Sequence, residues 1–277
     1  MRRAFNLFAL LVVLSPLSVL HAVEPLRFAP LNQRSPQLMA SYWNPILDYI
    51  GRKAGVALTL SIGKAAPDTT AMTVRGEVDL AFTNHLFTPE RDKLGWRVIA
   101  RPAGAAIWGE IVVLPDSPAQ KLADLEGRDV VFPSREAFVA YQVTMDGLTK
   151  QGVQVTPRFS GNQEGAMGQL RAGAVAAASV NGRVMADYAK REGVAYRTLW
   201  RSDSFHDLAV MAHPRVPAAQ LEALRRAFLG MADDPEGARI LEQVAALVKQ
   251  SPPFGFVASD NKDYDSYRRF FLKTQTR

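Results

Sequence analysis

Three polar residues, Thr83, Asn84 and His85, directly follow a short apolar run at residues 78–82. Such a run is typical of a buried strand, and Gly76 before it can end a helix in the left-handed conformation. Open α/β sheets present their ligand crevice at the carboxyl ends of parallel strands. We therefore interpret the three polar side chains as binding groups, although a strand followed by an ordinary loop would give the same pattern.

Motifs for catalysis and metal binding are absent from the sequence. It contains no GxSxG, phosphate-loop, HExxH, EF-hand or dinucleotide-binding glycine motif. The histidines beyond the leader, His85, His206 and His213, lack a recognised metal-ligand spacing. Neighbours on a strand point to opposite faces, so His206 and Asp207 are not expected to form a catalytic pair. We expect a protein that is not an enzyme and uses neither a metal nor a cofactor.

Helices and strands alternate along the chain, which predicts an α/β fold with mainly parallel sheets. Asn44 and Pro45 predict the start of a helix that Gly55 ends. A helix, glycine and strand unit at residues 168–182 repeats the layout around Gly76, and this repetition predicts two lobes. Strands are predicted at residues 26–30, 56–62, 78–82, 96–100, 108–114, 130–132, 153–159, 195–200 and 208–212, with helices at 138–150 and 183–192.

The middle of the chain is predicted to be inserted between two parts of the first lobe. Lobe 1 would comprise residues 23–110 and 208–277, and lobe 2 residues 111–207. Pro217 and Pro235 are suited to the first turns of two long helices that pack back on lobe 1. Two strands that connect the lobes would form a hinge, so we expect a cleft that closes.

The N-terminal residues have the order of a secretory signal peptide. Arg2 and Arg3 precede an apolar core at residues 5–14, and a small-residue boundary ends at Ala22. Residues 1–22 are therefore predicted to be a signal peptide, and the mature protein to be periplasmic. Cysteine is absent, so neither a disulfide nor a lipid-modified cysteine is expected. The net charge of +6 comes from scattered Lys and Arg residues, which does not favour nucleic acid binding.

The order of these elements resembles a known family, the periplasmic solute-binding proteins of phosphate, phosphite and phosphonate ABC transporters. The resemblance covers nearly all of the mature chain. The segments on which it rests are LRFAP, YWNPILDYIGRKAGV, GEVDLAF, IVVLPDSPAQKLADLEGRDVVF, GNQEGAMGQLRAG and SDSFHDLAVMAHP. It implies the two-lobed type II periplasmic binding protein fold, with a mainly parallel sheet flanked by helices in each lobe and two hinge strands.

The resemblance also implies positions for the aromatic side chains that close on the ligand in phosphonate binders. One falls at Thr69 and another at Ile107, where Trp108 next to it could supply the missing bulk.

The serine and threonine cradle that holds phosphonate oxygens in the family falls at Glu136, Ala137 and Phe138. The family's histidine becomes Gln163, whereas the carboxylate that pairs a ligand amine persists as Asp207.

These departures predict a changed ligand. Glu136 would repel a dianion at a helix start, although Arg135 could restore positive charge. Asp207 and Glu136 together favour a ligand that carries an amine or several hydroxyl groups. We expect weak binding of simple phosphonates, and an unused cleft in which both acids face solvent remains an alternative.

Two functions are compatible with this reading. The chain could be a monomeric transport receptor that captures a small-molecule solute and delivers it to an ABC permease. It could instead use the same fold to bind a membrane sensor protein, such as a histidine kinase or a diguanylate cyclase. The loss of the usual ligand residues favours the second function, and the family resemblance favours the first.

Cleavage of the leader after Ala22 is the first testable prediction. Intact-mass measurement of the protein from periplasm should give the mass of residues 23–277, because the small residues before the cleavage point suit signal peptidase. A membrane-bound species that retains Met1 would contradict it.

Overall fold

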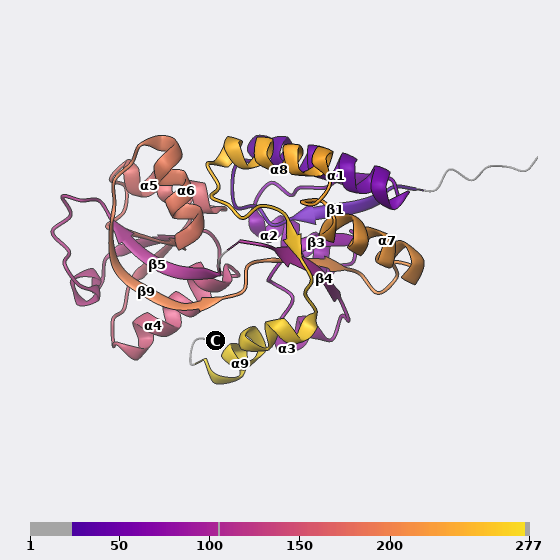
Figure 1. Cartoon of the computed structure of the whole chain (residues 1–277). Coiled ribbons are helices and arrows are strands. Elements are labelled where there is room, and N and C mark those ends of the chain that lie inside the picture. Colours follow the sequence, from indigo (N-terminus) through magenta and orange to yellow (C-terminus); the bar gives the residue numbers. More distant parts are fainter. Residues whose placement is uncertain (1–23, 105, 275–277) are drawn as a thin grey trace, which may run out of the picture.

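The computed structural model describes residues 24–104 and 106–274, which form two lobes (Figure 1). Each lobe is built on one β-sheet with helices on its faces. The predicted two-lobed α/β architecture is therefore confirmed. The predicted signal peptide lies outside the described residues.

The first lobe contains a six-stranded sheet with the order β11-β4-β10-β3-β1-β2. Four of these six strands, β1 to β4, run in one direction, and β10 and β11 run in the other. The strands are β1 (Leu26–Pro30), β2 (Leu58–Leu60), β3 (Leu80–Thr83), β4 (Arg97–Pro102), β10 (Ala209–Ala212) and β11 (Phe256–Val257).

The second lobe contains a five-stranded sheet with the order β7-β6-β8-β5-β9. Only β5 runs against the other four, so most strands of each sheet share one direction, as predicted. The strands are β5 (Ile107–Val113), β6 (Asp129–Phe132), β7 (Thr156–Phe159), β8 (Ala177–Asn181) and β9 (Arg197–Phe205).

The chain crosses between the lobes twice, from β4 to β5 and from β9 to β10. Residues 107–110 were expected in the first lobe, but they pair with β8 and β9 in the second sheet. The second crossing comprises residues 206–208. Rotation about these crossings, and with it the division of the chain into moving bodies, stays a prediction.

Helix α1 (Pro36–Ala54) begins earlier than the sequence predicts. The Ser35 side chain accepts a hydrogen bond from the backbone of the first turn, as an N-cap does. The prediction that Asn44 and Pro45 begin the helix was wrong, since Pro45 lies inside it. Proline removes one helical hydrogen bond, but the helix continues because apolar side chains on both sides of Pro45 are buried in the core. Gly55 ends the helix at φ 65°, as predicted.

The remaining helices cover the faces of the two sheets. Helix α1 packs against α7 and α8, and these three helices lie together over the first sheet (Figure 1). The first lobe contains α2 (Ala66–Val74), α3 (Pro89–Asp92), α7 (Ala218–Leu229), α8 (Pro235–Val248) and α9 (Asp265–Lys273). The second lobe contains the π-helical segment η2 (Phe138–Val143), α4 (Thr144–Lys150), α5 (Gln163–Arg171) and α6 (Gly182–Glu192).

Alternation along β5 divides the core of the second lobe into two layers. Ile111 and Val113 pack in one cluster with Leu148 of α4, whereas Val112 packs in another with Leu170 of α5. Successive side chains of a strand point to opposite faces. An uninterrupted apolar strand therefore requires helices on both faces of this sheet.

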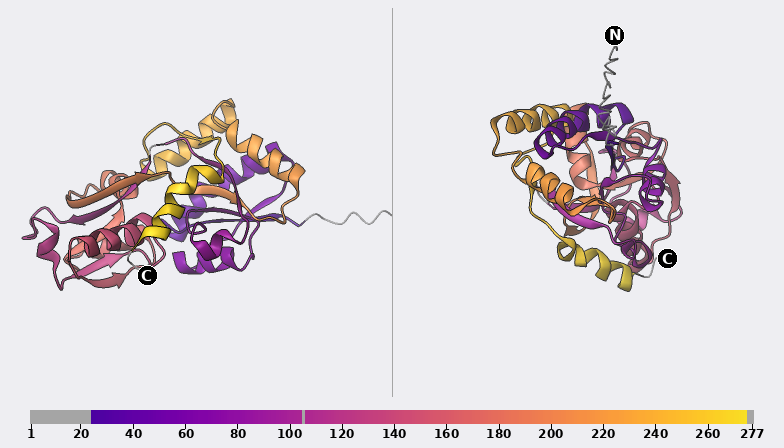
Figure 2. Two further views of the ribbon diagram at one scale, coloured as in Figure 1. Left: turned by 90° about the horizontal axis from the view of Figure 1, so that it is seen from below. Right: turned by 90° about the vertical axis from the view of Figure 1, so that its right-hand side faces the viewer.

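An aromatic cluster joins helix α9 to the second lobe. The Phe138 ring, at the start of η2, stacks on Tyr267 with 4.0 Å between ring centroids, and it also contacts Phe205, Phe270 and Phe271. Helix α9 runs from the first lobe toward the second (Figure 2). Phe138 was predicted to offer its face to a ligand, but most of its ring is buried in this cluster and its residue is only 2% exposed. The aromatic side chains of α9 thereby occupy much of the space around the start of η2.

Truncation of this ring should be costly. Phe138→Ala is expected to lower the free energy of unfolding by about 3–5 kcal/mol, because it removes a large buried ring and leaves a cavity. Urea unfolding followed by near-ultraviolet circular dichroism measures the change.

Leu272→Ala is the matched control on α9, since its side chain is 76% exposed. That substitution should change the free energy by no more than about 0.5 kcal/mol. Equal effects of the two substitutions would show that the aromatic cluster does not join α9 to the second lobe.

Candidate functional site

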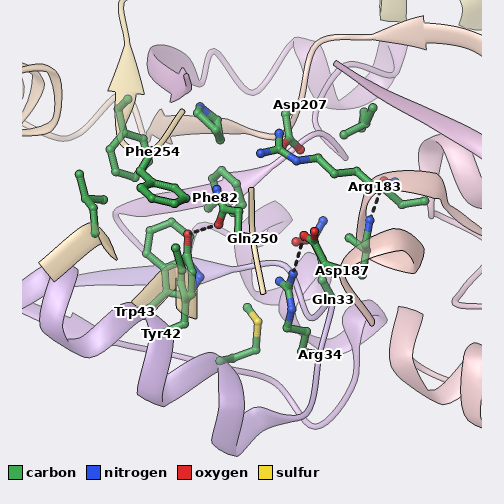
Figure 3. A pocket seen from close by; sticks show the side chains of 18 of the residues that line it. Gln33, Arg34, Tyr42, Trp43, Phe82, Arg183, Asp187, Asp207, Gln250 and Phe254 are labelled. Carbon is green, nitrogen blue, oxygen red and sulfur yellow. Dashed lines mark hydrogen bonds and ion pairs between the residues drawn. The ribbon is translucent and has the colours of Figure 1, made fainter. Parts of the chain in front are cut away.

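Four charged side chains converge on one cavity between the lobes, which we call the charged cavity (Figure 3). Arg34 follows β1 in the first lobe, Arg183 and Asp187 lie on α6 of the second lobe, and Asp207 lies on the second crossing. The free volume of the cavity is about 60 Å³. This volume suits a small ligand or a few water molecules.

The negative charge of Asp207 is compensated by an arginine of the same chain. The Arg183 Nη1 atom donates to Asp207 Oδ2 at 3.3 Å. Burial raises the pKa of the Asp207 carboxyl, and the Arg183 charge opposes that shift. A Cβ atom on Gly104 would lie 2.1 Å from the Arg183 guanidinium, so a larger residue there would require the Arg183 side chain to shift. By resemblance the family pairs this carboxylate with a ligand amine, and here Arg183 takes that place.

Arg34 and Asp187 form a looser pair across the cavity. Figure 3 shows the two side chains pointing toward one another, with 3.9 Å between Arg34 Nη2 and Asp187 Oδ2. Their side chains are only 12% and 9% exposed. Burial lowers the pKa of Arg34 and raises the pKa of Asp187, because both charged forms lose hydration.

Aromatic residues of the first lobe line the other side of the charged cavity. The Tyr42 hydroxyl donates to Gln250 Oε1 at 3.0 Å, and the Trp43 ring packs on Phe82 at 4.9 Å between centroids. Phe254 also faces this space (Figure 3). The cavity therefore combines an apolar wall with a few oriented polar groups, as small-molecule sites do.

A second and smaller cavity lies at the start of η2, where the resemblance places the anion cradle. We call it the cradle cavity, and its free volume is about 20 Å³. The predicted site residues that line it are Asn84, His85, Ile107, Ala137, Phe138 and Gln163. Ile107 also lines the charged cavity, so the two spaces are neighbours.

His85 is held as a neutral ring in the cradle cavity. The Thr70 hydroxyl donates to the Ala66 carbonyl, so its oxygen must accept from His85 Nδ1–H. That tautomer leaves Nε2 as an acceptor, and among the described residues neither Nε2 nor the buried Ser134 hydroxyl has a hydrogen-bond partner. Burial lowers the pKa of His85 to about 4. A neutral histidine supplies no positive charge to an anion at neutral pH.

Glu136 pairs with a cation from the other lobe. Its Oε1 atom accepts from Arg91 Nη2, and Arg91 Nη1 also donates to the His85 carbonyl at 3.1 Å. Arg135, which could have compensated the Glu136 charge, is exposed and lies over the Phe159 ring. Arg91, six residues after His85, compensates the Glu136 charge.

Besides Glu136, four predicted site residues line neither cavity, and they are Thr69, Thr83, Trp108 and Arg135. The Thr69 and Thr83 hydroxyls are buried in hydrogen bonds within the first lobe. The Trp108 indole donates to Glu110 within the second sheet. A ligand role for these four residues stays a prediction that their present contacts do not favour.

The sequence reasoning missed the residues that dominate the charged cavity. Arg183 and Asp187 lie one turn apart on α6, directly after the buried strand β8. Polar residues that directly follow a buried strand were also the reason for choosing Thr83, Asn84 and His85. Arg34, in a polar turn after β1, had the same position relative to its strand.

Two kinds of feature are not found in the described ranges 24–104 and 106–274. No group of three or more His, Asp or Glu side chains there could hold a metal ion. No helix within those ranges has the length and apolarity needed to cross a membrane.

A sequence model of one family matches residues 28–264, and its description is ABC transporter, phosphonate, periplasmic substrate-binding protein. The chain belongs to this family. It is therefore a periplasmic solute-binding component of an ABC transporter, and members of this family bind solutes rather than catalyse reactions. No curated protein matches the chain.

Solved structures share the fold of this phosphonate-family receptor. PhnD1 from Prochlorococcus marinus in complex with methylphosphonate has 14% identity and a TM-score of 0.75, over 90% of this chain and 97% of that chain. The binding component of a Pseudomonas aeruginosa phosphonate transporter has 18% identity and a TM-score of 0.76, over 90% and 86%. An ancestral arginine-binding protein bound to arginine has 20% identity and a TM-score of 0.55, over 79% and 97%. The type II fold is thereby confirmed for this receptor.

The buried His85 should make the stability of the receptor depend on pH. Its folded-state pKa of about 4 lies below the ordinary 6.5. Between these values the unfolded chain binds a proton that the folded receptor does not. The free energy of unfolding that His85 contributes therefore falls as the pH drops from about 6.5 to about 4, by on the order of 3 kcal/mol.

Urea unfolding of wild type and His85→Asn across this pH range isolates the contribution. The asparagine amide can still donate to Thr70, so the fold should persist while this part of the pH dependence disappears. Parallel stability curves for the two proteins would show that His85 is not the group responsible.

Proposed function

We propose that this receptor captures a small polar solute in the charged cavity and releases it to an ABC permease. The observation that carries the proposal is that four charged side chains from both lobes converge on one partly open cavity, and they are Arg34, Arg183, Asp187 and Asp207. A ligand in that space would contact both lobes at once. It would favour their closed arrangement, because it binds that arrangement more tightly than an open one.

The cradle cavity supports a changed ligand preference within the family. It is smaller than the charged cavity, its histidine is neutral, and Glu136 is engaged by Arg91. A phosphonate dianion there would lie near the Glu136 carboxylate and would lack a cationic partner of its own. We propose that simple phosphonates bind weakly, although relatives of the same fold include a methylphosphonate complex.

Several details of this function are proposals too. We propose that residues 1–22 are removed on export, that the mature receptor is a monomer, and that the lobes close about the strands near residues 108–113 and 208–212. A partnership with a membrane sensor is the second candidate. It is favoured by the Arg91–Glu136 pair, because this pair joins the two lobes without a ligand, next to the place where the resemblance puts the anion cradle. Permease and ATPase genes beside the gene for this chain would favour transport, whereas a sensor gene alone would favour the second candidate.

Solute capture is tested by denaturing receptor purified from periplasm and identifying released small molecules by mass spectrometry. Wild type should release one enriched solute, and Arg183→Gln should lose it because Asp207 is left without its cation. Calorimetry with phosphate, methylphosphonate and 2-aminoethylphosphonate should give affinities weaker than micromolar.

Arg158→Gln is the matched control, since it breaks an exposed ion pair with Asp129 in the same lobe. It should retain the solute. Micromolar binding of any of the three anions would overturn the proposed weak binding of phosphonates, and its loss in Gln163→Ala would place the anion in the cradle cavity.

A further inference from the structure

Arg34 and Asp187 are the least satisfied charges of the charged cavity. Within the described part of the chain, each has only the other as a charged partner within 4 Å, at 3.9 Å, which is too long for a hydrogen bond. Among the described residues, neither side chain has a hydrogen bond. A guanidinium has five N–H donors, and a carboxylate has about four acceptor positions. Both groups are nevertheless almost fully buried.

Neighbouring ion pairs on the same helix do close. Arg191 of α6 donates to Glu164 at 2.7 Å, and Arg183 donates to Asp207 at 3.3 Å. Buried polar groups are normally hydrogen-bonded, because an unmade bond costs free energy. Among the described residues, no polar atom of Arg34 or Asp187 is both completely buried and unpaired, so the two groups face the open space of the cavity, where polar ligand groups can pair with them.

We propose that the charged cavity, where it is lined by this pair, binds the head group of a small zwitterion of the α-amino acid class. The ligand carboxylate would accept from Arg34, and the ligand ammonium would donate to Asp187. The inference rests on the proposed solute capture, and it names the class of solute. An α-amino acid fits because it carries both charges on one carbon atom, so it can reach both side chains at once.

Charge balance favours a zwitterion over an ion. The two arginines and two aspartates of the cavity sum to zero, and a net-neutral ligand preserves that balance. A phosphonate dianion would face Asp187 and Asp207 without a spare cation. A simple carboxylic acid would leave Asp187 unsatisfied, and a simple amine would leave Arg34 unsatisfied, at the cost that buried unpaired charges carry.

The rest of the cavity limits the ligand body. The rings of Tyr42, Trp43 and Phe254 form its apolar wall, and the free volume of about 60 Å³ leaves little room beyond the head group. We therefore expect a small or compact apolar side chain on the amino acid.

Binding to mature full-length receptor, freed of solute by unfolding and refolding, tests the class. The probes are the common L-α-amino acids and, for the tightest of them, two matched compounds that lack either the amine or the carboxylate. At least one amino acid should bind by calorimetry. Loss of either group should weaken binding by about 10- to 100-fold, because each removes a hydrogen bond to a charged group.

A variant assigns the ammonium end of the ligand. Asp187→Asn should weaken the amino acid about 10- to 100-fold, yet leave its deaminated analogue at its own weaker affinity. Asp129→Asn, at an exposed pair of the same lobe, should change nothing. The comparison of analogues on wild type remains decisive even if a variant fails to fold.

Each outcome decides a different point. If the receptor captures a solute but binds no α-amino acid, the class is wrong and solute capture stands. If the deaminated analogue binds as tightly as the amino acid, the role of Asp187 is wrong. If neither a captured solute nor an amino acid binds, both proposals fail.

Discussion

Burial of charge between the lobes is the constraint on which this structure depends. An ion moved from water into a protein interior costs several kcal/mol unless a partner compensates it. Here the partners come from the opposite side of the junction: Arg91 of the first lobe meets Glu136 of the second, and Arg34 meets Asp187. The positions of these charges therefore couple the relative placement of the lobes to the chemistry of the space between them.

At the place where the resemblance puts the family's anion site, the side chains of this chain contact one another. Phe138 packs into the aromatic cluster of α9 where the resemblance implies a hydrogen-bonding side chain, and Glu136 engages Arg91. Both substitutions fill or neutralise a place that would otherwise attract an anion. The buried charged side chains lie instead in the neighbouring charged cavity, on the α6 side of Ile107.

A shared fold does not require a shared ligand. In both sheets the binding groups follow the carboxyl ends of strands, which is where open α/β sheets bring loops and helix starts together. Changes in those loops alter the ligand while the sheets remain, so membership of the phosphonate family identifies the receptor role and leaves the solute to the side chains of this chain.

The sequence by itself determined the alternation of strands and helices, the glycine that ends α1, the extent of the helix at residues 138–150 and the family. These features depend on local periodicity, backbone preference and element order, which can be read along the chain. Tertiary structure decided which charges meet. Arg34 and Asp187 come from different lobes, and Phe138 became a core residue only because α9, far along the chain, packs over it. Such pairings depend on how the lobes dock, and no local pattern encodes that arrangement.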